Sequence, residues 1–167
     1  MLPLTKVSHE HHEVLWGFVN RLNDLAECLD CDCLDSGRLM DQLPLMREVH
    51  DGLRDRLIPH METVEAAVFP TLERLATTRG TMVPMVTEHE EIRRLVAALG
   101  AFTNRPPAHV DRAAVLGLRR VLIRLYALLK THLAEEELYI PILEGRLTPV
   151  EEAVLARALD HQAIEPL

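Results

Sequence analysis

Apolar residues recur along this chain at alternating steps of three and four, the spacing that places side chains on one face of an α-helix. Four long segments show this pattern, and residues that favour turns separate them. The segments run from Thr5 or Ser8 to about Leu29, from about Arg38 to Ala76, from about Thr81 to just before Asn104, and from about Val110 to Gly145. A short C-terminal helix is expected after Thr148-Pro149. Because short connections between long helices make neighbours antiparallel, the sequence predicts an all-α, up-down four-helix bundle with a short extra C-terminal helix.

The composition agrees with this fold. Leu, Ala, Val, Glu and Arg dominate, and seven glycines and ten prolines in 167 residues are too few for a turn-rich β-sandwich. The length suits one hydrophobic core, and no low-complexity linker divides the chain. Residues 1–167 are therefore expected to form a single domain. Pro44 and Pro59 fall inside the second segment and are expected to kink it.

The net charge of the chain restricts the kinds of partner that it can bind. A formal net charge of −8 argues against nucleic-acid binding, which requires a basic surface to replace phosphate counterions. No apolar run approaches the 18 or so residues of a membrane span. The first six residues, Met1 to Lys6, lack the apolar region of a secretory signal, so a cytoplasmic location is expected. The sequence leaves the oligomeric state open.

Three cysteines lie close together, at Cys28, Cys31 and Cys33. An odd, tightly spaced set is a poor disulfide framework, and it lacks the second half of a zinc finger or ribbon. We interpret these residues as semi-exposed thiols at a helix end. A redox site or an accessory metal site is the alternative.

Two polar residues interrupt the apolar seam of the fourth segment. After four leucines at helical spacing, the seam continues with His132 and Glu136. A buried carboxylate is costly unless it is paired or binds a metal. The spacing of four places both side chains on one face, one turn apart, where they can reach the same ion. This pair alone fits a metal site and a core histidine bonded to a neighbouring glutamate equally well.

The first and third segments repeat this feature with His12 and His89, each on the apolar stripe of its helix. Aligning these two histidines also aligns the apolar residues that follow them, Leu15 with Ile92, Phe18 with Leu95, Val19 with Val96, and Leu22 with Leu99. The chain therefore carries a faint internal duplication. Inward histidines on three helices of one bundle favour a shared site over three separate structural residues.

The second segment matches the fourth imperfectly. Glu65 precedes Pro70 by five residues, as Glu136 precedes Pro141, but the residue four before Glu65 is Met61, and His60 lies one position earlier. On a regular helix, side chains five residues apart point about 140° away from each other. A π-bulge near Pro59 would add one residue to a turn and bring His60 into the site. Without it, Met61 fills the space and the site has five protein ligands.

These motifs resemble the hemerythrin-like family, also called the HHE cation-binding domain. The resemblance rests on the helix starts at residues 12–15 and 88–92 and on the segment 132–141, HLAEEELYIP, and it spans roughly residues 5 to 145. It implies two non-haem iron ions with an oxo or hydroxo bridge, although manganese or zinc would also suit the donors. By the same resemblance, the terminal ligands are His12, His60, His89 and His132, and the bridging carboxylates are Glu65 and Glu136.

The sequence departs from the oxygen carriers of the family, which have a second histidine one turn from the third-helix ligand. Here those positions are Met85 and Arg93. We therefore expect a di-iron protein that binds or reacts with a small oxidant such as O₂, peroxide or nitric oxide. Whether it turns over, as a peroxidase, a catalase-like enzyme or a nitric-oxide-reactive enzyme, is left open. The alternatives are an iron or oxygen sensor or an iron donor for iron–sulfur repair, without turnover, and a metal-free interaction bundle. Tyr139 either contacts the small ligand or is an ordinary aromatic at the bundle end.

Overall fold

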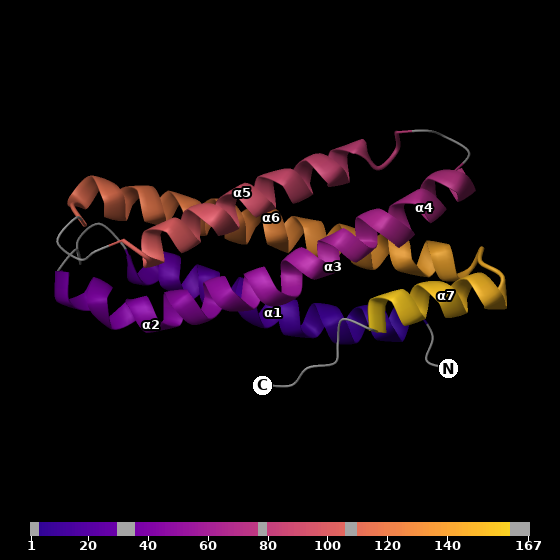
Figure 1. Cartoon of the computed structure of the whole chain (residues 1–167), viewed down its shortest axis with the longest axis horizontal. Helices are drawn as coiled ribbons and strands as arrows, with labels where there is room; N and C mark the ends of the chain where they lie inside the picture. Colours follow the sequence, from indigo (N-terminus) through magenta and orange to yellow (C-terminus); the bar gives the residue numbers. More distant parts are fainter. Residues whose placement is uncertain (1–3, 30–35, 77–79, 106–109, 161–167) are drawn as a thin grey trace.

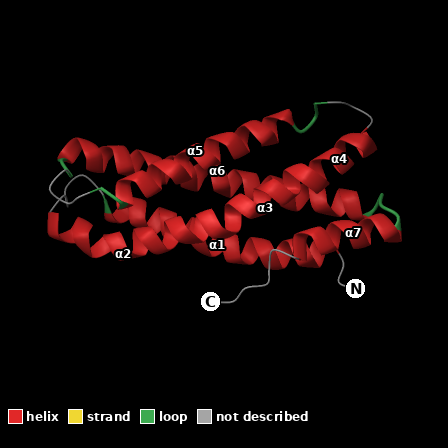
Figure 2. Cartoon of the chain, viewed as in Figure 1, coloured by secondary structure: helices red, strands yellow, loops and turns green. Residues whose placement is uncertain are grey.

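The computed structural model describes residues 4–29, 36–76, 80–105 and 110–160, and within these ranges it contains helices and turns but no strands (Figure 2). Four long helical rods lie side by side, and successive rods run in opposite directions (Figure 1). The first, third and fourth rods are α1 (Leu4–Cys28), α5 (Val83–Thr103) and α6 (Arg112–Glu144). The second rod comprises α2 (Ser36–Gly52), η2 (Leu53–Leu57), α3 (Ile58–Thr63), η3 (Val64–Val68) and α4 (Phe69–Ala76). The predicted all-α bundle is confirmed.

The predicted C-terminal helix is α7 (Pro149–Asp160), which packs against α1 and η3 (Figure 1). It begins with a capping box, because the Thr148 backbone N–H donates to Glu151 at 2.9 Å and the Glu151 N–H donates back to the Thr148 hydroxyl. Glu151 also pairs with Arg74 of α4 at 2.7 Å, which joins α7 to the second rod. Among the described residues, no helix is both long and apolar enough for a membrane span.

The second rod contains two π-helical turns, η2 and η3, separated by the six residues of α3. In η2, the Ile58 N–H bonds to the Leu53 carbonyl, five residues back, directly before Pro59. The bulge expected near Pro59 is therefore present, and η3 is a second one that the sequence did not predict. Gly52 precedes η2 at a close approach to α1, where any Cβ would overlap the Phe18 ring.

The hydrophobic core consists of two separate clusters. The larger one includes Leu15, Leu57, Ile92 and Leu129 and lies toward the α1–α2 end of the bundle. The smaller one lies toward α7 and collects apolar side chains from α1, η3, α4, α5, α6 and α7. Each of α1, the second rod, α5 and α6 has a buried histidine where the two clusters meet. His12 and His89 lie between members of the two clusters, whereas His60 and His132 each directly precede the last residue of their rod in the larger cluster, Met61 and Leu133. A polar layer therefore crosses the bundle between two apolar blocks.

Candidate metal centre

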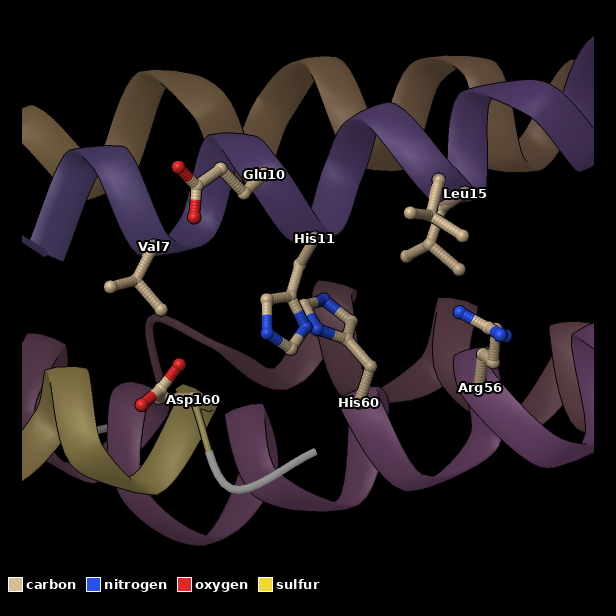
Figure 3. A pocket seen from close by; sticks show the side chains of 8 residues that line it. Val7, Glu10, His11, Leu15, Arg56, His60 and Asp160 are labelled. Atoms are coloured by element: carbon tan, nitrogen blue, oxygen red, sulfur yellow. The ribbon is translucent and has the colours of Figure 1, made fainter. Parts of the chain in front are cut away.

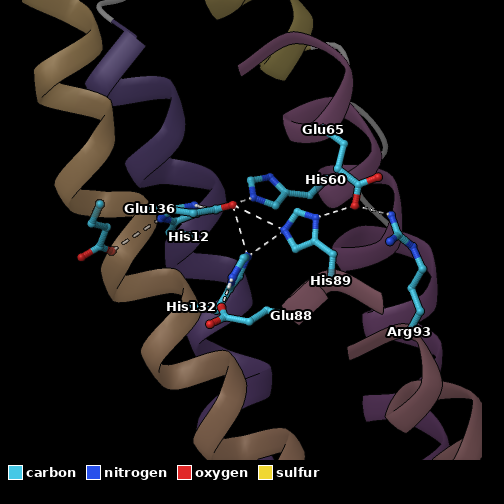
Figure 4. A network of polar contacts seen from close by, with 9 residues as sticks. His12, His60, Glu65, Glu88, His89, Arg93, His132 and Glu136 are labelled. Atoms are coloured by element: carbon cyan, nitrogen blue, oxygen red, sulfur yellow. Dashed lines mark hydrogen bonds and ion pairs between the residues drawn. The ribbon is translucent and has the colours of Figure 1, made fainter. Parts of the chain in front are cut away.

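Five of the six predicted ligands meet in this polar layer. Each of the four rods supplies one histidine, and α6 also supplies Glu136 (Figure 4). All five side chains are buried, with 5% exposure for Glu136 and 2% or less for each histidine. Because an exposed layer would be hydrated, this burial means that the polar atoms must satisfy one another or bind an ion.

His60 reaches the layer because of the irregular second rod. The π turn η2 shifts the register directly before α3, and the His60 imidazole then points into the bundle. Its Nε2 lies 3.0 Å from Oε2 of Glu136. Met61 is also fully buried, but it belongs to the larger apolar cluster. The π turn thus buries both neighbours, and the outward orientation of His60 that a regular helix would impose does not occur.

Glu136 lies at the centre of the four histidines (Figure 4), and each of its carboxylate oxygens is nearest to a different histidine pair. Oε2 is 3.1 Å from Nε2 of His12 and 3.0 Å from Nε2 of His60. Oε1 is 3.2 Å from Nε2 of His132 and 3.8 Å from Nε2 of His89. Two groups of three potential donors result, each with its donor atoms within 4.8 Å of one another, and both contain Glu136.

The pair His89 and His132 has a geometry that suits two ligands of one ion. Their Nε2 atoms face each other at 2.9 Å, while the outer Nδ1 atoms contact Glu65 at 2.6 Å and Glu88 at 3.1 Å. An acceptor at each Nδ1 favours a proton there, which leaves two Nε2 lone pairs directed at each other. Two donors bound at about 2.1 Å to one ion, at right angles, are about 3 Å apart. A cation between these nitrogens therefore fits both their chemistry and their spacing.

Glu65, the sixth predicted ligand, lies at the edge of the layer. Its carboxylate bonds to Nδ1 of His89 and, at 2.8 Å, to Arg93, and its side chain is 28% exposed. The structure does not bring it into either group of three donors within the described residues. In this arrangement Glu65 orients His89 from outside, and its role as a bridging ligand stays a prediction.

Electrostatics favour an ionised carboxylate at the centre. Burial raises the pKa of Glu136, but the facing imidazoles of His60, His12 and His132 outweigh it and hold this pKa well below its usual range. Burial lowers the pKa of His132, but Glu136 and Glu88 outweigh it and leave that pKa raised. The charged carboxylate is thus available to a cation.

The sequence did not reveal the residues around the ligands. Glu88, which contacts His132, and Glu137, whose Oε1 lies 3.6 Å from Nδ1 of His12, give two of the histidines an outer carboxylate. Such partners orient metal-bound imidazoles. The only hint of these contacts in the sequence is that positions 88 and 137 are acidic and adjoin His89 and Glu136. Helical spacing does not tell which neighbouring helix an acidic side chain will contact. The sequence also gave no sign that His11 would lie near His60, although their ring centroids are 6.2 Å apart.

A small cavity of about 10 Å³ adjoins the centre, lined by His60, Glu136, Tyr139 and mainly apolar side chains. This volume is about the minimum that holds one water molecule. Tyr139 thus borders the site, as one of its two predicted alternatives requires. Of the cysteines, Cys28 is exposed, whereas Cys31 and Cys33 fall outside the described residues.

Comparison with known proteins gave a match to one protein family. A family model described as "Hemerythrin HHE cation binding domain" matches residues 3–143, and a second match covers residues 85–167. The overlapping second match is consistent with the internal duplication. No curated protein and no solved structure gave a match. The chain belongs to the hemerythrin HHE cation-binding family.

Proposed function

We propose that this chain is a non-haem di-iron protein that binds or reacts with a small oxidant, O₂, peroxide or nitric oxide, at the centre around Glu136. The observation that carries the proposal is the position of this carboxylate. Each of its oxygens faces a different pair of imidazole nitrogens, as a carboxylate shared between two ions would.

The donor set supports iron among the candidate metals. Imidazole and carboxylate donors suit iron, manganese and zinc. A thiolate would favour softer ions, and the described residues of the centre include none. Each group offers three protein donors and therefore leaves coordination positions for an exogenous molecule. Iron bound there would supply the redox chemistry toward the oxidant.

The protein's own residues provide the surroundings for such a reaction. The apolar blocks on both sides exclude water from the layer, and the carboxylates of Glu65 and Glu88 hold two imidazoles in fixed orientations. The cavity beside Glu136 and Tyr139 is small, which favours a diatomic molecule or peroxide over a larger substrate.

The test is metal analysis with an optical spectrum of protein purified from iron-supplemented cells. We expect about two irons per chain and an iron-dependent near-ultraviolet band that changes when O₂, hydrogen peroxide or nitric oxide is added to the reduced protein. Iron content near zero would overturn the proposal. Two irons whose spectrum does not respond to any of the three molecules would instead indicate an iron sensor or an iron donor.

A further inference from the structure

A second, larger cavity of about 100 Å³ lies on the outer side of His60 (Figure 3). It lies between α1, the second rod and the end of α7 and is partly open to solvent, and its polar lining consists of Glu10, His11, Arg56, His60 and Asp160. The volume is enough for several water molecules or a hydrated ion in transit.

His60 belongs both to the lining of this cavity and to the metal centre. Its Nε2 faces Glu136, whereas its Nδ1 is buried and has no hydrogen-bond partner among the described residues. Nδ1 of His89 and of His132 contacts a carboxylate, and Nδ1 of His12 has a carboxylate oxygen 3.6 Å away without a hydrogen bond. His60 instead has the ring of His11 nearby, with the two ring centroids 6.2 Å apart. Nε2 of His11 is likewise buried and unpartnered. Two buried imidazole nitrogens without a hydrogen-bond partner among the described residues therefore belong to side chains that line one cavity beside the centre.

The charges around these nitrogens favour a cation. Figure 3 shows Glu10 and Asp160 together on one side of the His11–His60 pair, with Arg56 at the opposite end beside Leu15. Burial and the neighbouring imidazoles lower the pKa of His11, whereas Asp160 and Glu10 act in the opposite direction. Two carboxylates and one guanidinium line the cavity, so the charge of its fixed groups is negative.

We propose that this cavity is the entry site for divalent metal ions, which Asp160 and Glu10 attract, His11 binds transiently, and His60 passes to the centre. A half-turn of the His60 ring about its Cβ–Cγ bond would carry Nδ1 to the present position of Cδ2, on the side of the ring where Nε2 now lies. The same nitrogen could then face the cavity before the half-turn and the centre after it. The cavity is a passage rather than a storage site, because only the two groups at Glu136 bring three donors within 4.8 Å in the described part of the chain. This inference rests on the proposed metal centre.

The experiment measures the rate of Fe²⁺ uptake by metal-free protein under anaerobic conditions, with a chromogenic chelator to quench unbound Fe²⁺ at successive times. The test variants are His11→Ala and Asp160→Asn, alone and combined. His9→Ala and Glu13→Gln are matched controls, because they remove the same groups from an exposed pair on the same helix. Asp160 is exposed, so its variant should fold even if His11→Ala does not. Thermal unfolding of each metal-free variant checks this.

We expect the combined variant to take up Fe²⁺ about tenfold more slowly, at unchanged final stoichiometry, because acidic clefts raise the arrival rate of cations by about this factor or more. The controls should match the wild type. Unchanged uptake in the cavity variants, or equal slowing in the controls, would overturn the entry site. A lower final stoichiometry at unchanged rate would also overturn it, by making His11 a ligand of the centre. No uptake by the wild type would refute the proposed function itself.

Discussion

Replacement of Glu136 by glutamine is the sharpest test of a shared carboxylate. Glutamine has nearly the same size, but it carries no charge and offers one oxygen and one NH₂ group, which cannot bind a metal ion. Because each oxygen of Glu136 faces a different histidine pair, at least one group of three donors loses a ligand. We expect Glu136→Gln to bind at most one iron.

The size of the effect follows from linkage. At free Fe²⁺ about 100-fold above the dissociation constant, each bound ion stabilises the fold by about 2.7 kcal/mol, so two ions contribute about 5.4 kcal/mol. In a chain of 167 residues, 1 kcal/mol moves the melting temperature by roughly 2–4 °C. Iron should therefore raise the melting temperature of the wild type by about 10–20 °C. The variant should retain about half of this rise or less.

The assay combines iron analysis with thermal unfolding followed by circular dichroism, with and without Fe²⁺ under anaerobic conditions. Glu135→Gln is the matched control, since it removes the same charge one position away, off the polar layer. It should keep two irons and the whole rise in melting temperature. If Glu136→Gln also keeps both, the carboxylate is not a shared ligand and our interpretation of the centre is wrong.

Three further predictions use other parts of the molecule. His60→Ala and His132→Ala should each lose at least one iron and lower the melting temperature. The control His109→Ala, at a position outside the described residues, should do neither. Equal iron contents in all three variants would show that the site is misplaced. In the metal-free protein, the raised pKa of His132 means that its contribution to stability is complete below about pH 6.5 and is lost as pH rises through the folded pKa. Iron binding instead strengthens with pH, because the ligands must lose their protons. The difference between the melting temperatures of the iron-bound and the metal-free protein should therefore widen from about pH 6 to 8. Gly52→Ala should destabilise the fold by about 1–3 kcal/mol in urea titrations, because its Cβ would overlap an aromatic ring of α1, and Gly17→Ala, where a Cβ meets open space, should be neutral or stabilising.

The bundle and most of the centre could be predicted because both depend on helical periodicity. His12, His89 and His132 occupy positions where the pattern calls for leucine, and a helix that buries its apolar stripe must bury them too. His60 could be predicted only as one of two alternatives. Its orientation depends on a π turn, and the helical period of the apolar residues does not tell whether such a turn forms.

The position of Glu65 shows where sequence spacing stops being informative. Its alignment with Glu136 places it at the correct height along the second rod, but height does not determine which neighbour a long side chain bonds to. In the structure Arg93 and His89 hold its carboxylate at the edge of the layer. Glu88 and Glu137 illustrate the same limit. Helical periodicity places them beside the apolar face of their helices, but it does not tell which residues of other helices they contact.

The division of the core has a consequence for how the protein opens. Each apolar block buries its own side chains, and contacts across the polar layer depend on charged and hydrogen-bonded groups. Without metal, the smaller block near α7 can therefore unfold by itself, and its amides exchange with solvent through this local opening rather than through global unfolding. Ions bound to all four rods would join the two blocks into one cooperative unit. Hydrogen exchange in the smaller block would then become as slow as in the larger one.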